Sequence, residues 1–101
     1  MKPFKIADEY LPHIHPRAVA KLERWINQAG LNSSFWQALL SGRYGDAACN
    51  ADPDNLASLG WIIRFLEVSA PGECFGSEEA VESWNGLVSM ALNGVQTGVS
   101  P

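Results

Sequence analysis

The sequence predicts an all-α protein, a compact single-domain bundle of four to five short helices. Three observations carry this prediction. Apolar residues recur at helical spacing in four stretches, prolines and glycines mark the ends of these stretches, and no run alternates at the period of two typical of a half-buried strand. With 101 residues, 47% apolar and 18% charged, the chain has the composition of a globular protein with one core. We expect an ordered core over about residues 4–94 and a frayed tail over 95–101.

The N-terminal stretch, residues 3–11, leaves two interpretations open. Its apolar side chains fit a short helix that is broken at Pro12. Because the stretch is so short, periodicity alone does not separate a helix from an irregular segment.

The first predicted long helix covers about residues 16–29. Pro16 suits the first helical position, because a proline lacks the amide hydrogen that would have no partner there. Apolar residues, among them Leu22 and Ile26, then recur at helical spacing until Gly30. This pattern predicts an amphipathic helix that ends at the glycine.

The second predicted helix is short and covers about residues 34–41. We expect Ser34 to accept from the first-turn amides while Gln37 reaches back to complete a capping box. The apolar contacts of this helix come from Phe35, Trp36, Leu39 and Leu40. Gly42 and Gly45 are interpreted as residues that end helices, which leaves a long loop before the next helix.

The third predicted helix is the central one. Asp52 has the character of an N-cap, and Pro53 suits the first helical position after it. A broad apolar stripe follows, made of Leu56, Leu59, Ile62, Ile63 and Leu66. Trp61 and Phe65 extend this apolar surface, and we expect the helix to end near residues 70–72.

The fourth predicted helix covers about residues 78–93. Ser77 is expected to cap it, and two glutamates follow in the first turn, where the helix dipole favours negative charge. The apolar stripe is made of Val81, Trp84, Val88, Ala91 and Leu92, and it ends at Gly94. Gly86 lies inside the predicted helix, so we expect either a weaker helix or a close neighbour at this position.

The charge is unevenly distributed along the chain, which has a net charge of -4. Residues 1–43 hold six Lys or Arg against three acidic residues, whereas residues 44–101 hold only Arg64 against eight. The net negative charge argues against binding of phosphate by the whole surface. The two halves are expected either to present opposite faces to a partner or to form ordinary solvated surface.

Compartment and membrane signals are also in the sequence. No run approaches the length of a membrane-spanning helix, and the N-terminal residues lack the continuous apolar stretch of a signal peptide. Cys49 and Cys74 are the only cysteines, too few for a secreted disulfide scaffold. We therefore expect a cytoplasmic protein without a membrane segment.

The residues that carry chemistry elsewhere do not form a recognisable catalytic or metal-binding set here. His13 and His15 make an H-x-H pair that can begin a metal site, but neither cysteine stands at a ligand spacing. The sequence contains no nucleophile elbow and no phosphate-binding glycine loop. We expect a protein that is not an enzyme and holds no metal or cofactor.

One segment resembles a known family. Residues 30–42 place Gly30, Leu31, Trp36, Leu39 and Gly42 at the spacing of a helix-turn-helix of the phage-repressor type. Residues 16–66 resemble the surrounding helices more loosely. The resemblance implies that Ser33, Ser34, Gln37 and Ala38 face the major groove of DNA, with Arg24 and Arg43 near phosphates. The alternative interpretation is a plain helical hairpin closed by glycines.

The aromatic residues indicate a second kind of function. Four tryptophans in a small domain suggest an interface, since tryptophan is enriched in binding hot spots. We expect Trp61 and Trp84 to pack in the core. Trp36 stands beside Phe35 on a short helix that is not expected to hide both rings, so of the four tryptophans we expect Trp36 to be the exposed one.

These observations give a leading hypothesis and an alternative. The leading hypothesis is a non-enzymatic protein that docks on a larger protein assembly through Phe35, Trp36, Arg43 and Tyr44. Its size and composition suit an inhibitor from a phage or mobile element that blocks a host nucleic-acid-binding defence complex, as anti-CRISPR proteins do. The alternative is a small helix-turn-helix transcriptional regulator that binds DNA through Ser33, Ser34, Gln37, Arg24 and Arg43.

Overall fold

The computed structural model describes residues 3–30 and 33–88, and within these ranges it contains helices and no strands. In chain order the elements are η1 (Asp8–Tyr10), α1 (Pro16–Gln28), α2 (Ser34–Leu40), α3 (Tyr44–Asn50), α4 (Pro53–Val68), η2 (Gly72–Cys74) and α5 (Glu78–Ser83), where η denotes a 3-10 helix. The prediction of an all-α domain is confirmed.

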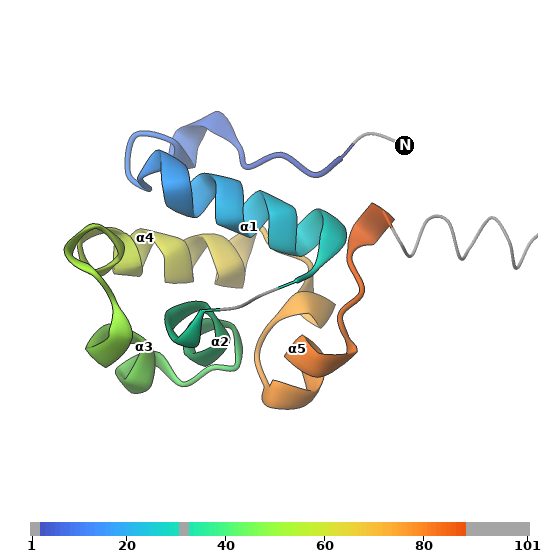
Figure 1. Ribbon diagram of the computed structural model, residues 1–101. Coiled ribbons are helices and arrows are strands. Elements are labelled where there is room, and N and C mark those ends of the chain that lie inside the picture. Colours follow the sequence, from blue (N-terminus) through green and yellow to red (C-terminus); the bar gives the residue numbers. More distant parts are fainter. Residues whose placement is uncertain (1–2, 31–32, 89–101) are drawn as a thin grey trace, which may run out of the picture.

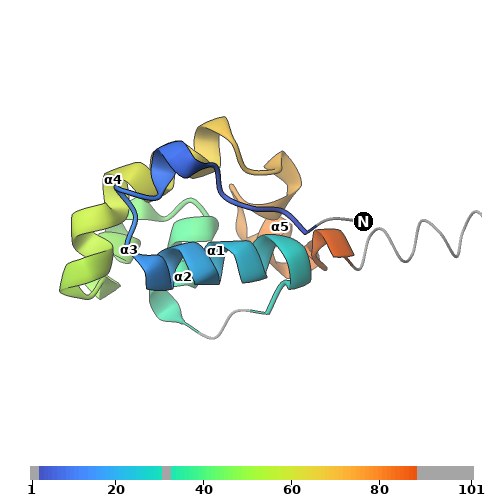
Figure 2. The ribbon, with the colours of Figure 1, turned by 90° about the horizontal axis from the view of Figure 1, so that it is seen from above.

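The two long helices, α1 and α4, form one part of the molecule and the three short helices the other (Figure 1). The N-terminal segment with η1 runs along α1 in both views (Figures 1 and 2). It is attached there by Asn27, whose side chain accepts from the Phe4 amide at 2.7 Å and donates to the Phe4 carbonyl at 3.0 Å. The core lies between the helices and is centred on large, fully buried side chains such as Leu22, Ile62 and Phe65.

Helix α1 begins and ends close to where the sequence predicts. Pro16 takes the first helical position, and His15 before it has an extended backbone. The Nδ1 atom of His15 accepts from the amide of Ala18 at 3.3 Å, so a histidine caps this helix. The helix ends where Ala29 and Gly30 adopt positive φ angles of 60° and 87°.

Helices α2 and α3 form a tight hairpin, and here the sequence prediction was partly wrong. Ser33, not Ser34, precedes α2, and its side chain makes no capping bond, so there is no capping box. Gly42 ends α2 with a φ of 87°, as expected. Gly45 does not end a helix but lies in the first turn of α3, in a stretch interpreted as loop. Burial of Ala47 against α2 supplies the apolar contact that stabilises this short helix.

Helix α4 starts as the sequence predicts. The Oδ1 atom of Asp52 accepts from the Asn55 amide at 2.8 Å, and Pro53 opens the helix. The expected apolar stripe is buried only in part, because Leu56 remains 53% exposed. Trp61 is half-buried rather than a core residue, and Val68 near the end of the helix is 71% exposed.

Helix α5 is much shorter than the predicted helix. It ends at Ser83, Trp84 is extended, and Gly86 adopts a φ of 91°. The break allows the Trp84 indole to donate to the Trp25 carbonyl at 2.8 Å, near the end of α1. A side chain at position 86 would overlap the Asn27 carbonyl, so the close neighbour is α1. The predicted continuation over residues 89–93 and the predicted frayed tail over 95–101 lie outside the described residues.

Candidate functional site

The two aromatic residues predicted as docking anchors lie in the core. Phe35 is 3% exposed and Trp36 is 4% exposed, and their rings meet edge to face with centroids 4.9 Å apart. The prediction that one ring is exposed was wrong, because α2 packs against neighbours on more than one side. The sequence did contain the signal. A short helix that is apolar nearly all round is typical of a buried helix.

Arg43 and Tyr44, the other two predicted docking residues, lie at the surface but are bound to carboxylates. Arg43 forms ion pairs with Asp46 at 3.5 Å and Glu78 at 3.6 Å. The Tyr44 hydroxyl donates to a carboxylate oxygen of Glu67 at 3.0 Å. Partial burial of the phenol raises the pKa of Tyr44, and the hydrogen bond and negative charge of Glu67 raise it further.

The residues predicted to contact DNA bases are not all on one exposed face. Ser34 and Gln37 are exposed, but Ser33 is half-buried and Ala38 is buried. Arg24 is exposed on α1. Leu31, which belongs to the helix-turn-helix resemblance, lies outside the described residues.

The surroundings of Gln37 are acidic. Gln37 lines a shallow hollow between α2 and α5, together with Ser41, Arg43, Glu78, Val81 and Glu82. Of the two glutamates, Glu78 pairs with Arg43. Negative charge therefore lies beside the side chain that the resemblance assigns to the major groove.

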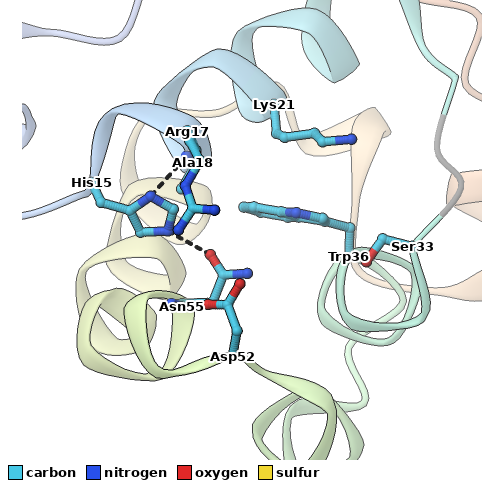
Figure 3. A pocket seen from close by; sticks show the side chains of 8 residues that line it. All are labelled: His15, Arg17, Ala18, Lys21, Ser33, Trp36, Asp52 and Asn55. Atoms are coloured by element: carbon cyan, nitrogen blue, oxygen red, sulfur yellow. Dashed lines mark hydrogen bonds between the residues drawn. The ribbon is translucent and has the colours of Figure 1, made fainter.

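A polar pocket of about 260 Å³ lies where α1, α2 and α4 begin (Figure 3). It is lined by His15, Arg17, Ala18, Lys21, Ser33, Trp36, Asp52 and Asn55. The residues that precede the three helices, His15, Ser33 and Asp52, all belong to this lining. Sequence reasoning missed this site as a unit, since the sequence identifies helix starts one at a time but not which starts meet in space.

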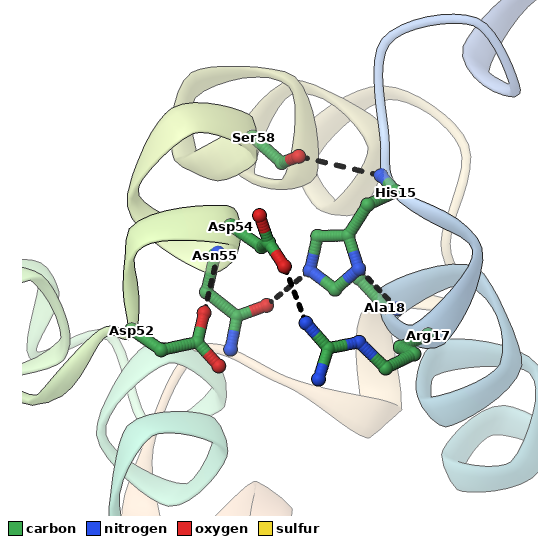
Figure 4. A network of polar contacts seen from close by, with 7 residues as sticks. All are labelled: His15, Arg17, Ala18, Asp52, Asp54, Asn55 and Ser58. Carbon is green, nitrogen blue, oxygen red and sulfur yellow. Dashed lines mark hydrogen bonds and ion pairs between the residues drawn. The ribbon is translucent and has the colours of Figure 1, made fainter.

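The polar contacts on one side of this pocket join α1 to α4 (Figure 4). The Nε2 atom of His15 lies 2.6 Å from Oδ1 of Asn55, and the His15 amide donates to the Ser58 hydroxyl at 3.3 Å. Arg17 on α1 pairs with Asp54 on α4. Since the His15 Nδ1 atom accepts from a backbone amide, the ring must carry its proton on Nε2 and donate it to Asn55. Both ring nitrogens are thus engaged, and His15 acts as a clamp between the helices.

The H-x-H pair does not converge on one point. His13 stacks on the Trp61 ring with centroids 3.8 Å apart, while His15 faces α4. Cys49 is exposed on α3, and Cys74 is buried, which raises the pKa of its thiol to about 12. Over residues 3–30 and 33–88, histidines, cysteines and carboxylates form no group of three that would hold a metal ion.

The exposed side of α1 carries a row of basic residues beside an apolar hollow. Arg17, Lys21 and Arg24 follow one another at spacings of four and three residues, with Ala20 between them. Ala20 also borders a hollow of about 300 Å³ between α1 and the segment before it, lined by Leu11, Ile14, Pro16, Val19, Ala20 and Glu23. We call this combined surface, from Leu11 through Ala20 to Lys21 and Arg24, the α1 outer face.

Among the helices that the structure describes, none combines the length and the apolar character needed to cross a membrane. Comparison with protein-family models, with curated proteins and with solved structures finds no match to this chain.

Proposed function

We propose that this chain is a non-enzymatic docking protein whose target is a larger protein assembly. Its small size and composition suit an inhibitor carried by a phage or mobile element and directed at a host defence complex that binds nucleic acid, as anti-CRISPR proteins are. On this proposal it acts in the cytoplasm by occupying a surface, with no chemical step of its own.

The observation that carries the proposal is the α1 outer face. Leu11 is 44% exposed at the edge of an apolar hollow, and basic side chains stand directly beside it. A contiguous apolar surface with a charged border is typical of protein interaction sites. Since Phe35 and Trp36 are buried, the anchor is assigned to this face and not to α2.

The engagement of His15 and the burial of Cys74 support a role without catalysis by these two side chains. His15 uses both ring nitrogens within the fold, so neither is available as a general base in this geometry. Cys74 has a pKa of about 12 and is buried, and both features keep its thiol protonated and inaccessible.

Regulation of transcription through DNA binding is the second candidate. Ser34, Gln37 and Arg24 are exposed, which base or phosphate contacts require. This candidate ranks lower because the one cation in the hollow with Gln37, Arg43, is paired with Glu78, and the remaining charge of Glu82 would repel phosphates of a bound duplex.

The two candidates differ in how binding responds to salt. A protein that holds DNA loses affinity for random-sequence duplex steeply as salt is raised. We expect only weak binding of this chain to random duplex at low salt. Strong duplex binding that falls steeply with salt and is reduced by Arg24→Ala would favour the regulator and contradict docking as the main function.

Docking itself is tested with purified complexes. The chain is mixed with RNA-guided defence complexes and passed over a sizing column, and binding of the complex to its target DNA is measured in parallel. We expect co-elution with at least one complex and reduced target binding. If the chain co-elutes with none of the complexes, the inhibitor proposal is contradicted.

A further inference from the structure

We propose that the α1 outer face binds an acidic, amphipathic helical segment of the partner protein. This inference rests on the proposed docking function and names the chemistry of the segment that the face recognises. It is carried by the charge of the face, by the apolar hollow beside that charge and by the spacing of the basic residues.

The charge argument starts from the pairing of the Lys and Arg residues in the described part of the chain. Three of them form ion pairs within the fold: Lys5 with Glu23, Arg17 with Asp54, and Arg43 with Asp46 and Glu78. Arg64 lies over the Trp61 ring, 5.4 Å from its centroid. Within these same residues Lys21 and Arg24 alone lack such a partner, and both are exposed on α1. A protein with a net charge of -4 thus leaves two adjacent cations for an external carboxylate.

The apolar hollow determines the shape of the partner. It runs beside the basic row, and its apolar lining is formed by Leu11, Ile14, Pro16, Val19 and Ala20, with Ala20 touching both features. The carboxylate of Glu23 also borders the hollow and pairs with Lys5. A helix laid into a groove presents apolar side chains on one face and charged side chains on its border. The small Ala20 side chain at the centre leaves room for such a helix to approach α1.

The spacing of the cations fits the same partner. Lys21 and Arg24 are three residues apart on one helix, so they project from neighbouring positions. Glutamates three or four residues apart on a partner helix have matching spacing. Such exposed pairs contribute mainly to orientation and association rate, and the apolar contact contributes most of the affinity.

Other occupants fit this face less well. Duplex DNA and an anionic membrane both need more unpaired cations than two, and duplex DNA has no apolar surface to fill the hollow. A second copy of this chain would bring the acidic residues Glu78, Glu79 and Glu82 of α5. The only apolar residues of that helix are Ala80 and Val81, both half-buried, so it offers little apolar surface.

The test uses synthetic amphipathic helices of about four turns as probes. All carry the same leucine face, and their flanking positions are all Glu, all Gln or all Lys. Binding is measured by fluorescence anisotropy for the native chain and for the double variant Lys21→Glu/Arg24→Glu. We expect the native chain to prefer the Glu-flanked peptide over the Lys-flanked one by about tenfold or more, and the double variant to reverse this order.

A matched control makes the same charge change elsewhere. Ala57→Glu/Arg64→Glu/Val68→Glu lowers the net charge by the same four units at exposed positions of α4, so it should keep the preference of the native chain. Leu11→Ser should lower the affinity for all three peptides by the same factor, because it affects only the apolar hollow. Circular dichroism of each variant verifies that the fold is intact.

Several outcomes would overturn the inference. The first is that the Glu-flanked peptide does not bind at concentrations up to about 1 mM. The second is that the native chain and the double variant rank the three peptides in the same order of affinity. The third is that the control variant loses more of the preference for the Glu-flanked peptide than the double variant does. Stronger binding to random duplex, to phosphatidylserine vesicles or to a second copy through Lys21 and Arg24 would also overturn it. If a defence complex co-elutes equally with the native chain and the double variant, the α1 outer face is not the binding surface, but the proposed docking function is supported.

Discussion

His15 illustrates how a single side chain connects two helices. Its Nδ1 atom takes the capping role that serine or aspartate usually fills, and its Nε2 atom donates to Asn55 on α4. A serine is too short to do both. The same ring therefore fixes the start of α1 and the position of α1 against α4.

Replacement of His15 by alanine should lower the free energy of unfolding by about 1–3 kcal/mol, because a cap and an interhelical hydrogen bond are both lost. His15→Asn should recover part of this loss, since asparagine caps helices but is too short to span to Asn55. Urea unfolding of the three proteins measures the effect. Equal stability of the alanine variant and the native chain would contradict the clamp.

The two cysteines should differ sharply in reactivity. Cys49 is exposed, whereas Cys74 is buried and its pKa is raised to about 12 by burial. A thiol reagent at pH 8 should modify one thiol per native chain and two per unfolded chain, and Cys49→Ser should abolish the native reaction. Reaction of two thiols in the native chain would contradict this assignment.

Because the pKa of the Cys74 thiol is higher in the folded chain than in the unfolded chain, its contribution to stability is present below about pH 9 and declines as the pH rises toward 12.

Among the helices, α2 differs most between the role that the sequence predicts and the role that the structure shows. The sequence predicts an exposed aromatic anchor on this helix, but the helix buries Phe35, Trp36, Ala38, Leu39 and Leu40. Only Ser34 and Gln37 of this helix are exposed. Helix α2 is therefore a core element whose exposed surface is small.

Two neighbouring substitutions test this role. Trp36→Ala should lower the free energy of unfolding by about 3–5 kcal/mol, because a large buried side chain is removed. Gln37→Ala, at the next position, should change stability by less than about 0.5 kcal/mol. Chemical denaturation distinguishes them, and a Trp36 variant as stable as the Gln37 variant would place the indole outside the core.

The break after α5 gives a second test at this scale. Gly86 has a positive φ and lies against the Asn27 carbonyl, so Gly86→Ala adds both backbone strain and a steric overlap. We expect a loss of about 1–3 kcal/mol. Gly60 lies inside α4 with open space around it, and Gly60→Ala should raise stability by about 0.5–1 kcal/mol. Thermal melts that rank the two variants in the opposite order would contradict the contact with α1.

At the scale of the whole molecule, local signals were predictable and juxtapositions were not. The starts of α1 and α4 follow from Pro16 and from the Asp52 and Pro53 pair, whose effects act within one helical turn. Helix α3 was missed because its stability comes from packing on α2, against the local preference of Gly45. The length of α5 was missed because the conformation of Gly86 depends on a residue of α1.

The candidate site follows the same division. The basic residues of α1 and the helix caps were visible in the sequence, but the pocket at the three helix starts needs contacts between segments far apart in the chain. The burial of Phe35 and Trp36 is a property of the assembled core, and the shortness of α2 by itself suggested the opposite.

For the whole molecule we also expect stability that does not depend on metals or reductants. Both cysteines are free thiols, and the described residues form no three-ligand cluster. Thermal unfolding with a chelator, and separately with a reductant, should give the same melting temperature as the untreated protein. A drop of several degrees with either reagent would contradict this expectation.

The indole of Trp84 and the backbone at Gly86 close over the last turn of α1, 59 residues away in the chain at the Trp25 carbonyl. Contacts so distant in sequence form late, because the loop between them must be ordered first. During synthesis on the ribosome, α1 emerges early but its end stays uncovered until residues 84–86 have emerged too. The end of α1 is therefore covered only after residues 84–86 have left the ribosome, and until then the backbone at Trp25 and Asn27 is accessible to chaperones and to neighbouring nascent chains.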